Sequence, residues 1–133
     1  MIERRTFPRY PITFPVTFTL GSGENEQSFE TQCVNISRAS IEISAETAAV
    51  KAMLEMSEYP QQANLKFHMP SHKIMFCASA QVVTHRRLSQ HQYYIVMVFG
   101  EFRSGSEELL DESLKEFEPG VFNTDTSIRS SYA

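Results

Sequence analysis

Apolar and polar residues alternate strictly from position 12 to position 20. The apolar positions are Ile12, Phe14, Val16, Phe18 and Leu20, with three threonines and Pro15 between them. Successive side chains of a β-strand point to opposite faces, so this period of two predicts a strand with one buried face. Pro15 has no N–H to donate to a neighbouring strand, and it therefore predicts an edge position or a bulge.

Shorter segments of the same kind follow, separated by polar turn residues. They predict further strands at about 28–34, 41–45, 65–69, 75–83 and 93–99. After the third strand, Ala49, Met53 and Met56 recur at helical spacing, which predicts a short helix within residues 47–56. Several short strands with turn signals between them are typical of a small antiparallel barrel.

A second helix is predicted after the last strand. Ser104 and Glu107 have the spacing of a capping box, and Leu110, Leu114 and Phe117 then mark one apolar face. This helix has the size to lie across an open end of the barrel. The predicted fold class is therefore all-β, a small six-stranded antiparallel barrel with a C-terminal α-helix.

The length of 133 residues suits one domain. Its pattern divides into an arginine-rich arm at 1–11, the barrel with its closing helix at 12–118, and a polar tail at 119–133. We expect the arm and the tail to be flexible.

Composition and charge exclude several classes of protein. The net charge of −4 argues against a general binder of nucleic-acid polymers. No apolar run approaches the length needed to cross a bilayer, so membrane insertion is not expected. The first five residues are followed by no apolar segment of the kind found in secretory signals, and the cytoplasm is the expected location.

The chain also lacks the usual signatures of metal sites and of catalysis. Cys33 and Cys77 are far apart and form no CxxC pattern, and the histidines have no acidic or thiolate partner at a convincing spacing. No nucleophile–base arrangement or phosphate-cradling glycine loop is visible. The sequence therefore predicts no metal site, no cofactor, no catalytic residues and no enzymatic activity.

Three arginines stand before the first strand, although acidic residues are in excess over the whole chain. They are Arg4, Arg5 and Arg9. An arginine fork bonds two acceptors in one plane, such as guanine O6 and N7 or two phosphate oxygens, and it also stacks on a base. Pro8 biases the residue before it toward an extended conformation, which separates Arg5 from Arg9. The arm therefore suits a ligand that offers both guanine edges and phosphates.

A polar segment between the second and third predicted strands carries Asn35 and Ser37. An Asn amide pairs with a purine edge, and a Ser hydroxyl donates or accepts a hydrogen bond. The two side chains share a face because they stand two residues apart. The alternative is a turn in which both side chains satisfy nearby backbone groups. Arg38 is expected to be a solvated loop residue.

Taken together, these segments resemble the signature of the PilZ family, RxxxR followed by (D/N)xSxxG. Here the first motif is Arg5 to Arg9, and the second runs from Asn35 to Ser40. The resemblance covers about residues 4–117. The segment Arg4-Arg5-x-x-Pro8-Arg9 is similar to the extended form of the first motif, and residues 94–99 are similar to the family's last strand.

The resemblance implies a bacterial receptor for the second messenger cyclic di-GMP, which changes conformation on binding and signals to a separate, unidentified protein partner. The ligand-binding residues that it implies are Arg4, Arg5, Arg9, Asn35, Ser37 and Ser40, with Arg4 associated with binding a stacked ligand pair. Ser40 departs from the family pattern, because it stands where the motif has glycine. A glycine at this position could supply a positive φ or let the ligand approach the backbone closely. Two alternatives follow: a receptor whose affinity Ser40 weakens, or a PilZ-fold protein-interaction domain that does not bind nucleotide.

Overall fold

The alternating segments form six strands in the computed structural model, which describes residues 7–21, 23–56, 61–70, 74–103 and 106–117. The strands are β1 Pro15–Leu20, β2 Gln27–Ile36, β3 Ser40–Glu46, β4 Gln62–His68, β5 Met75–Arg87 and β6 Gln92–Phe102. The helices are α1 Thr47–Leu54, α2 Glu107–Lys115 and a single 3₁₀ turn, η2, at Gly23–Asn25. Each predicted strand and both predicted helices are therefore present.

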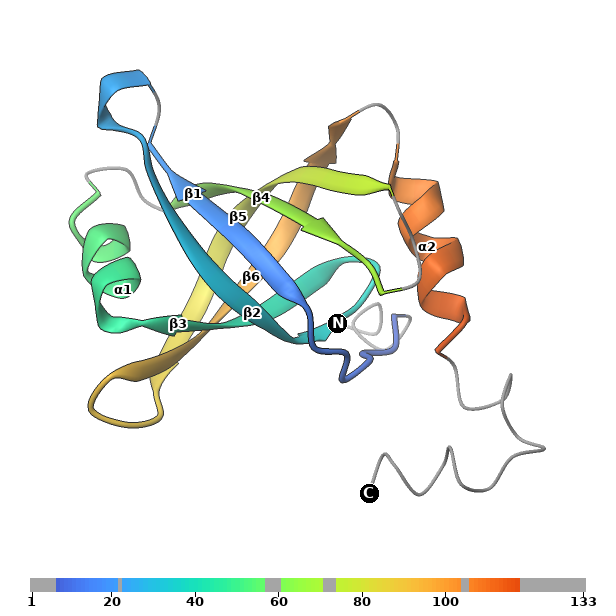
Figure 1. The fold of residues 1–133 in the computed structure, drawn as a ribbon, viewed down its shortest axis with the longest axis horizontal. Helices are drawn as coiled ribbons and strands as arrows, with labels where there is room; N and C mark the ends of the chain where they lie inside the picture. Colours follow the sequence, from blue (N-terminus) through green and yellow to red (C-terminus); the bar gives the residue numbers. More distant parts are fainter. Residues whose placement is uncertain (1–6, 22, 57–60, 71–73, 104–105, 118–133) are drawn as a thin grey trace.

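The strands close into a barrel in the order β1-β2-β3-β6-β5-β4, and every neighbouring pair is antiparallel (Figure 1). This confirms the predicted all-β barrel with a C-terminal helix. The prediction of an edge or a bulge at Pro15 is wrong, because β1 pairs with β2 on one side and β4 on the other. Pro15 is instead the first residue of β1, a position that tolerates a missing N–H.

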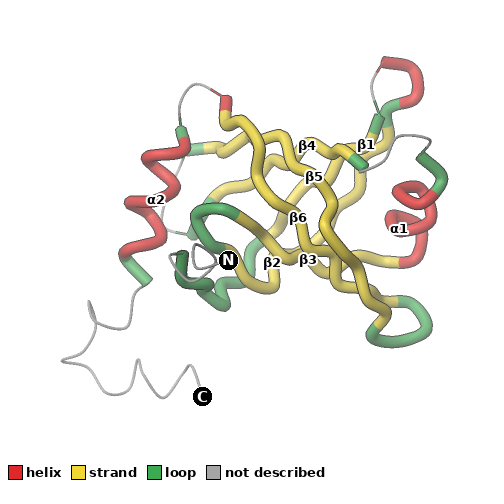
Figure 2. The backbone as a smooth tube through the Cα atoms, turned by 180° about the vertical axis from the view of Figure 1, so that it is seen from behind, coloured by secondary structure: helices red, strands yellow, loops and turns green. Residues whose placement is uncertain are grey.

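The two α-helices lie at opposite ends of the barrel (Figures 1 and 2). The buried residues of α1 are Ala49, Val50 and Met53, and α2 buries Leu110 and Leu114 in the same core. Helix α2 begins later than its capping-box spacing predicts, with Ser106 rather than Ser104 as the N-cap residue. No helix in the described ranges is both long enough and apolar enough to span a bilayer.

Aromatic rings cluster in the barrel, with Phe67 of β4 at their centre. The Phe67 ring lies 5.4 Å from that of Phe14, 5.5 Å from that of Phe76 and 6.3 Å from that of Phe99, measured between centroids. Aromatic pairs at these separations contribute beyond the area that they bury. Phe67 is only 2% exposed. Through these ring contacts it links the segment before β1 to β4, β5 and β6.

Candidate functional site

The chain enters the barrel through a short segment that lies along the end of β2. Tyr10 donates a backbone hydrogen bond to the Ile36 carbonyl at 2.8 Å and accepts one from the Ile36 N–H at 3.0 Å. The Cys33 N–H donates to the Phe14 carbonyl at 2.8 Å. Tyr10 is also buried, at 6% exposure. These contacts fix the point at which the described part of the arm, residues 7–11, meets the second sequence motif.

Asn35 faces outward beside this segment because the pairing of β2 with β3 shifts between Cys33 and Asn35. A bulge of this kind re-aims side chains. Cys33 and Ile36 are buried in the core, while Asn35 lies opposite Glu42 of β3. Its amide Nδ2 donates to Glu42 Oε1 at 2.7 Å.

Arg9 reaches the same amide from the arm. Its Nη1 donates to Asn35 Oδ1 at 3.4 Å, across 26 residues of sequence. The fold therefore brings together one residue from each of the two sequence motifs. We call the outer surface formed by Arg9, Asn35, Glu42 and the turn 37–40 the arm face.

The turn between β2 and β3 is closed by the side chain of Ser37. Its hydroxyl accepts hydrogen bonds from the backbone N–H groups of Ala39 at 3.1 Å and Ser40 at 3.0 Å. The Ser37 and Ser40 hydroxyl oxygens also lie 3.1 Å apart. Ser37 is 2% exposed. In this structure Ser37 thus does what the turn alternative predicts, and it shapes the turn from within.

Ser40 is the first residue of β3 and pairs with Val98 of β6. Residues in a strand ladder have extended backbone, which any residue type adopts. The role left for a glycine at this position is therefore the absence of a side chain, which would let a ligand approach the turn closely.

Arg38 is an exposed turn residue, as predicted. Its guanidinium also lies over the Phe7 ring, 5.1 Å from the centroid, so the turn holds the arm through a cation–π contact. Phe7, Tyr10 and Arg38 also border a hollow of about 250 Å³, which α2 closes with Leu114. Arm, turn and closing helix therefore meet at one place.

Electrostatics on this face combine basic side chains with one carboxylate that is 9% exposed, that of Glu42. Burial, reinforced by the nearby charge of Glu42, raises the pKa of the Cys33 thiol. Cys33 is therefore protonated at neutral pH and behaves as a small apolar core residue.

The structure thus gathers Arg9, Asn35, Ser37 and Ser40, whereas Arg4 and Arg5 lie outside the described residues. Sequence reasoning missed Glu42. A signal for it was present, because Ile41 and Ile43 point inward and the residue between them must face outward. The bulge before Asn35 has no comparable signal in the sequence. It determines that Glu42 is the β3 residue that pairs with Asn35.

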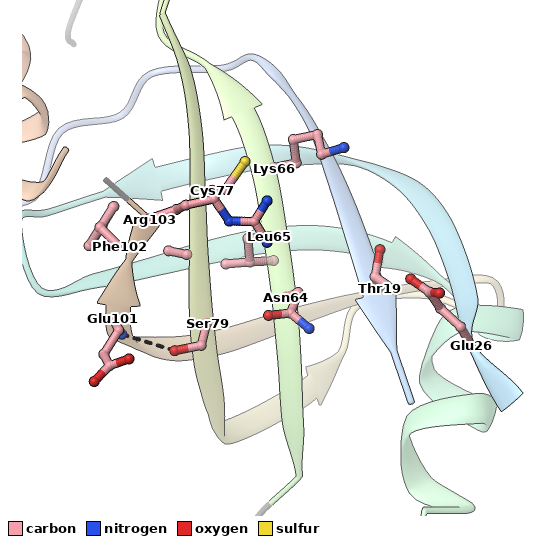
Figure 3. A pocket seen from close by; sticks show the side chains of 11 residues that line it. Thr19, Glu26, Asn64, Leu65, Lys66, Cys77, Ser79, Glu101, Phe102 and Arg103 are labelled. Atoms are coloured by element: carbon pink, nitrogen blue, oxygen red, sulfur yellow. Dashed lines mark hydrogen bonds between the residues drawn. The ribbon is translucent and has the colours of Figure 1, made fainter. Parts of the chain in front are cut away.

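A second hollow, of about 480 Å³, lies on the strands across the barrel from β2 and β3 (Figure 3). Its polar lining includes Thr19, Asn64, Lys66, Ser79 and Arg103, with acidic residues at two places on the rim. The Ser79 hydroxyl accepts a hydrogen bond from the Glu101 N–H at 2.9 Å, which ties β5 to the irregular end of β6.

Gly100 is close to this bond, and Gly100→Ala tests it. A Cβ at residue 100 would lie 2.5 Å from Ser79 Oγ. We expect the substitution to displace the hydroxyl and to lower the free energy of unfolding by about 1–2 kcal/mol, measured by urea denaturation. In a Ser79→Ala background the same substitution should cost much less. An equal cost in both backgrounds would show that the Ser79 contact is not responsible.

Comparison with known proteins identifies the fold. No protein-family model and no curated protein matches the sequence. Among solved structures, the PilZ domain of Escherichia coli YcgR with c-di-GMP matches with a TM-score of 0.57 and 14% identity, over 91% of this chain and 96% of that domain. The Bacillus subtilis inhibitor of motility MotI/DgrA matches with a TM-score of 0.59 and 17% identity, over 82% of this chain and 48% of its own.

The K. pneumonia MrkH–c-di-GMP complex also matches, with a TM-score of 0.54 and 17% identity, over 96% of this chain and 55% of MrkH. The fold is therefore PilZ-like. This chain spans about half the length of MotI/DgrA and of MrkH.

Proposed function

We propose that this chain is a receptor for cyclic di-GMP that binds the ligand on the arm face, has no catalytic role, and passes the signal to a protein partner. The observation that carries the proposal is the contact between Arg9 and Asn35. These residues belong to the two separate halves of the motif, and the fold places them within hydrogen-bond distance on the barrel's outer surface. The PilZ-like fold supports the same conclusion, since two of the solved structures that share it hold c-di-GMP.

Each residue has a role that suits its chemistry. Arg9, with Arg4 and Arg5 before it in the arm, supplies guanidinium forks for guanine and phosphate oxygens. Asn35 offers its amide to the other edge of the guanine. Ser37 and Ser40 form the turn that borders the ligand. On binding, we expect the arm to close over the ligand and to give a partner a new surface.

Calorimetric titration with cyclic di-GMP, with GTP and cyclic di-AMP as controls, tests this function. We expect saturable binding of cyclic di-GMP only. A stoichiometry of two ligands per chain would agree with a role for Arg4 in holding a stacked pair. The absence of any heat of binding with a folded sample would contradict the proposed receptor function.

The second candidate function is a PilZ-fold interaction domain that binds a protein but no nucleotide. The observation that favours it is the turn itself, in which the Ser37 and Ser40 hydroxyl oxygens lie within hydrogen-bond distance of each other. This candidate predicts partner binding that cyclic di-GMP does not change and that survives substitution of Arg9.

Ser40→Gly separates the two candidates. Removing the Ser40 side chain frees the Ser37 hydroxyl from one neighbour and opens the turn to the ligand. We expect cyclic di-GMP to bind about threefold to tenfold more tightly, the gain of about one hydrogen bond. Ser44→Gly, which loosens the same strand away from the turn, is the matched control and should bring no gain. A failure of both the wild type and Ser40→Gly to bind would favour the interaction domain.

A further inference from the structure

The Asn35 amide has a hydrogen-bond partner on each side, and both partners favour the same orientation of the amide. Its nitrogen donates to Glu42 Oε1 at 2.7 Å, and its oxygen accepts from Arg9 Nη1 at 3.4 Å. A carboxylate only accepts hydrogen bonds and a guanidinium only donates them. Turning the amide by 180° would therefore set oxygen against oxygen on one side and donor against donor on the other.

Of the two contacts, the one with Glu42 is the stronger constraint. It is shorter and partly buried, whereas the contact with Arg9 is exposed. Glu42 also lies directly opposite Asn35 in the ladder between β2 and β3, so the strand pairing fixes both ends of the bond. The amide orientation therefore persists when the exposed Arg9 side chain turns from Asn35 toward a ligand.

The burial of Glu42 is unfavourable in free energy if its role is only structural. It is 9% exposed, and within the described residues no cation forms an ion pair with it. A carboxylate removed from water without a counter-charge is unfavourable, and a neutral side chain would bridge β2 and β3 at lower cost. Among the described residues, the side-chain hydrogen bond of Glu42 is the one that orients Asn35.

We propose that Glu42 sets the guanine preference of the arm face, by holding the Asn35 amide with its oxygen toward the ligand. The inference rests on the proposed function, and it identifies Glu42 as the residue that makes ligand binding selective for guanine. Guanine presents two adjacent donors on its Watson–Crick edge, N1–H and the N2 amino group, whereas adenine presents one donor, the N6 amino group, beside an acceptor at N1. An outward oxygen on Asn35 can therefore accept from both guanine donors but from only one adenine donor, and an outward amide nitrogen would pair with adenine N1. Glu42 is thus a positioning residue that lets an asparagine act as an acceptor.

The test exchanges the two functional groups between the two positions. Glu42→Gln keeps the shape but allows either orientation of Asn35, and we expect cyclic di-GMP affinity to fall about tenfold. The preference for cyclic di-GMP over cyclic di-AMP should fall with it. The pair Asn35→Asp with Glu42→Gln places the carboxylate at 35 and the amide at 42, and it should restore both affinity and preference. Asn35→Asp alone sets two carboxylates against each other and should bind poorly.

Two results would overturn the inference: unchanged affinity and preference in Glu42→Gln, or equal losses in that variant and in the exchanged pair. Side-chain amide resonances of Asn35 in the ligand-free protein give a separate measurement. We expect slow hydrogen exchange in the wild type and fast exchange in Glu42→Ala. If the wild type binds no cyclic di-GMP but shows this difference, the proposed function fails while the positioning by Glu42 stands.

Discussion

Arg9→Glu should weaken cyclic di-GMP binding at least about 100-fold, which amounts to abolishing it at ordinary protein concentrations. The variant removes a guanidinium fork and places a negative charge beside Asn35, where we propose that the ligand's guanine and phosphate groups lie. Arg9 is exposed, so the free energy of unfolding should change by no more than about 0.5 kcal/mol. Calorimetry measures the affinity, and thermal unfolding checks that the barrel is intact. The same result is expected for Arg5→Glu.

Arg103→Glu is the matched control for these charge reversals. Arg103 is also exposed but lines the second hollow, on the opposite side of the barrel. It makes the same change in net charge, so it shows how much of any loss comes from long-range repulsion of an anionic ligand. Normal binding by Arg9→Glu and Arg5→Glu would mean that the assignment of the site is wrong. Equal losses in all three variants would point to net charge rather than to the arm.

Phe67→Ala should lower the free energy of unfolding by about 3–5 kcal/mol, the largest stability effect that we expect in this chain. The substitution leaves a cavity where the ring contacts Phe14, Phe76 and Phe99. Domains of this size are stable by only about 5–15 kcal/mol, so the urea midpoint should fall by a large fraction. Phe67→Leu, which keeps most of the volume, should cost about 1–2 kcal/mol. A loss below about 1 kcal/mol for Phe67→Ala would show that these rings are not the centre of the core.

Much of the fold could be predicted from the sequence because the barrel has one inside and one outside. Every residue from Ile12 to Leu20 that was predicted to be buried is buried, since one face of each strand must cover the core. The closing helix was predictable for the same reason, because Leu110 and Leu114 lie on one face of α2. The strand order and the closure of the barrel do not follow from periodicity alone, and the edge position predicted for Pro15 was wrong on that account.

The site was harder to predict, because its geometry depends on departures from regular pairing. The shift in pairing between Cys33 and Asn35 places Glu42 opposite Asn35, and a strict period of two does not contain that shift. The Ser37 hydroxyl points into the β2–β3 turn and accepts hydrogen bonds from nearby backbone N–H groups, a local arrangement that the motif does not distinguish from a ligand contact. Arg38 stacks on Phe7, a contact between segments far apart in the sequence. What the motif does indicate is which residue types meet on the arm face.

An NMR titration of the isotope-labelled protein with cyclic di-GMP, followed residue by residue, reports both whether the ligand binds and where it binds. We predict saturable changes at Arg9, Asn35, Arg38 and Ser40, with the resonances of Ser79 and its neighbours across the barrel unchanged. No change anywhere, or changes confined to the second hollow, would contradict the proposal that the arm face is the cyclic di-GMP site.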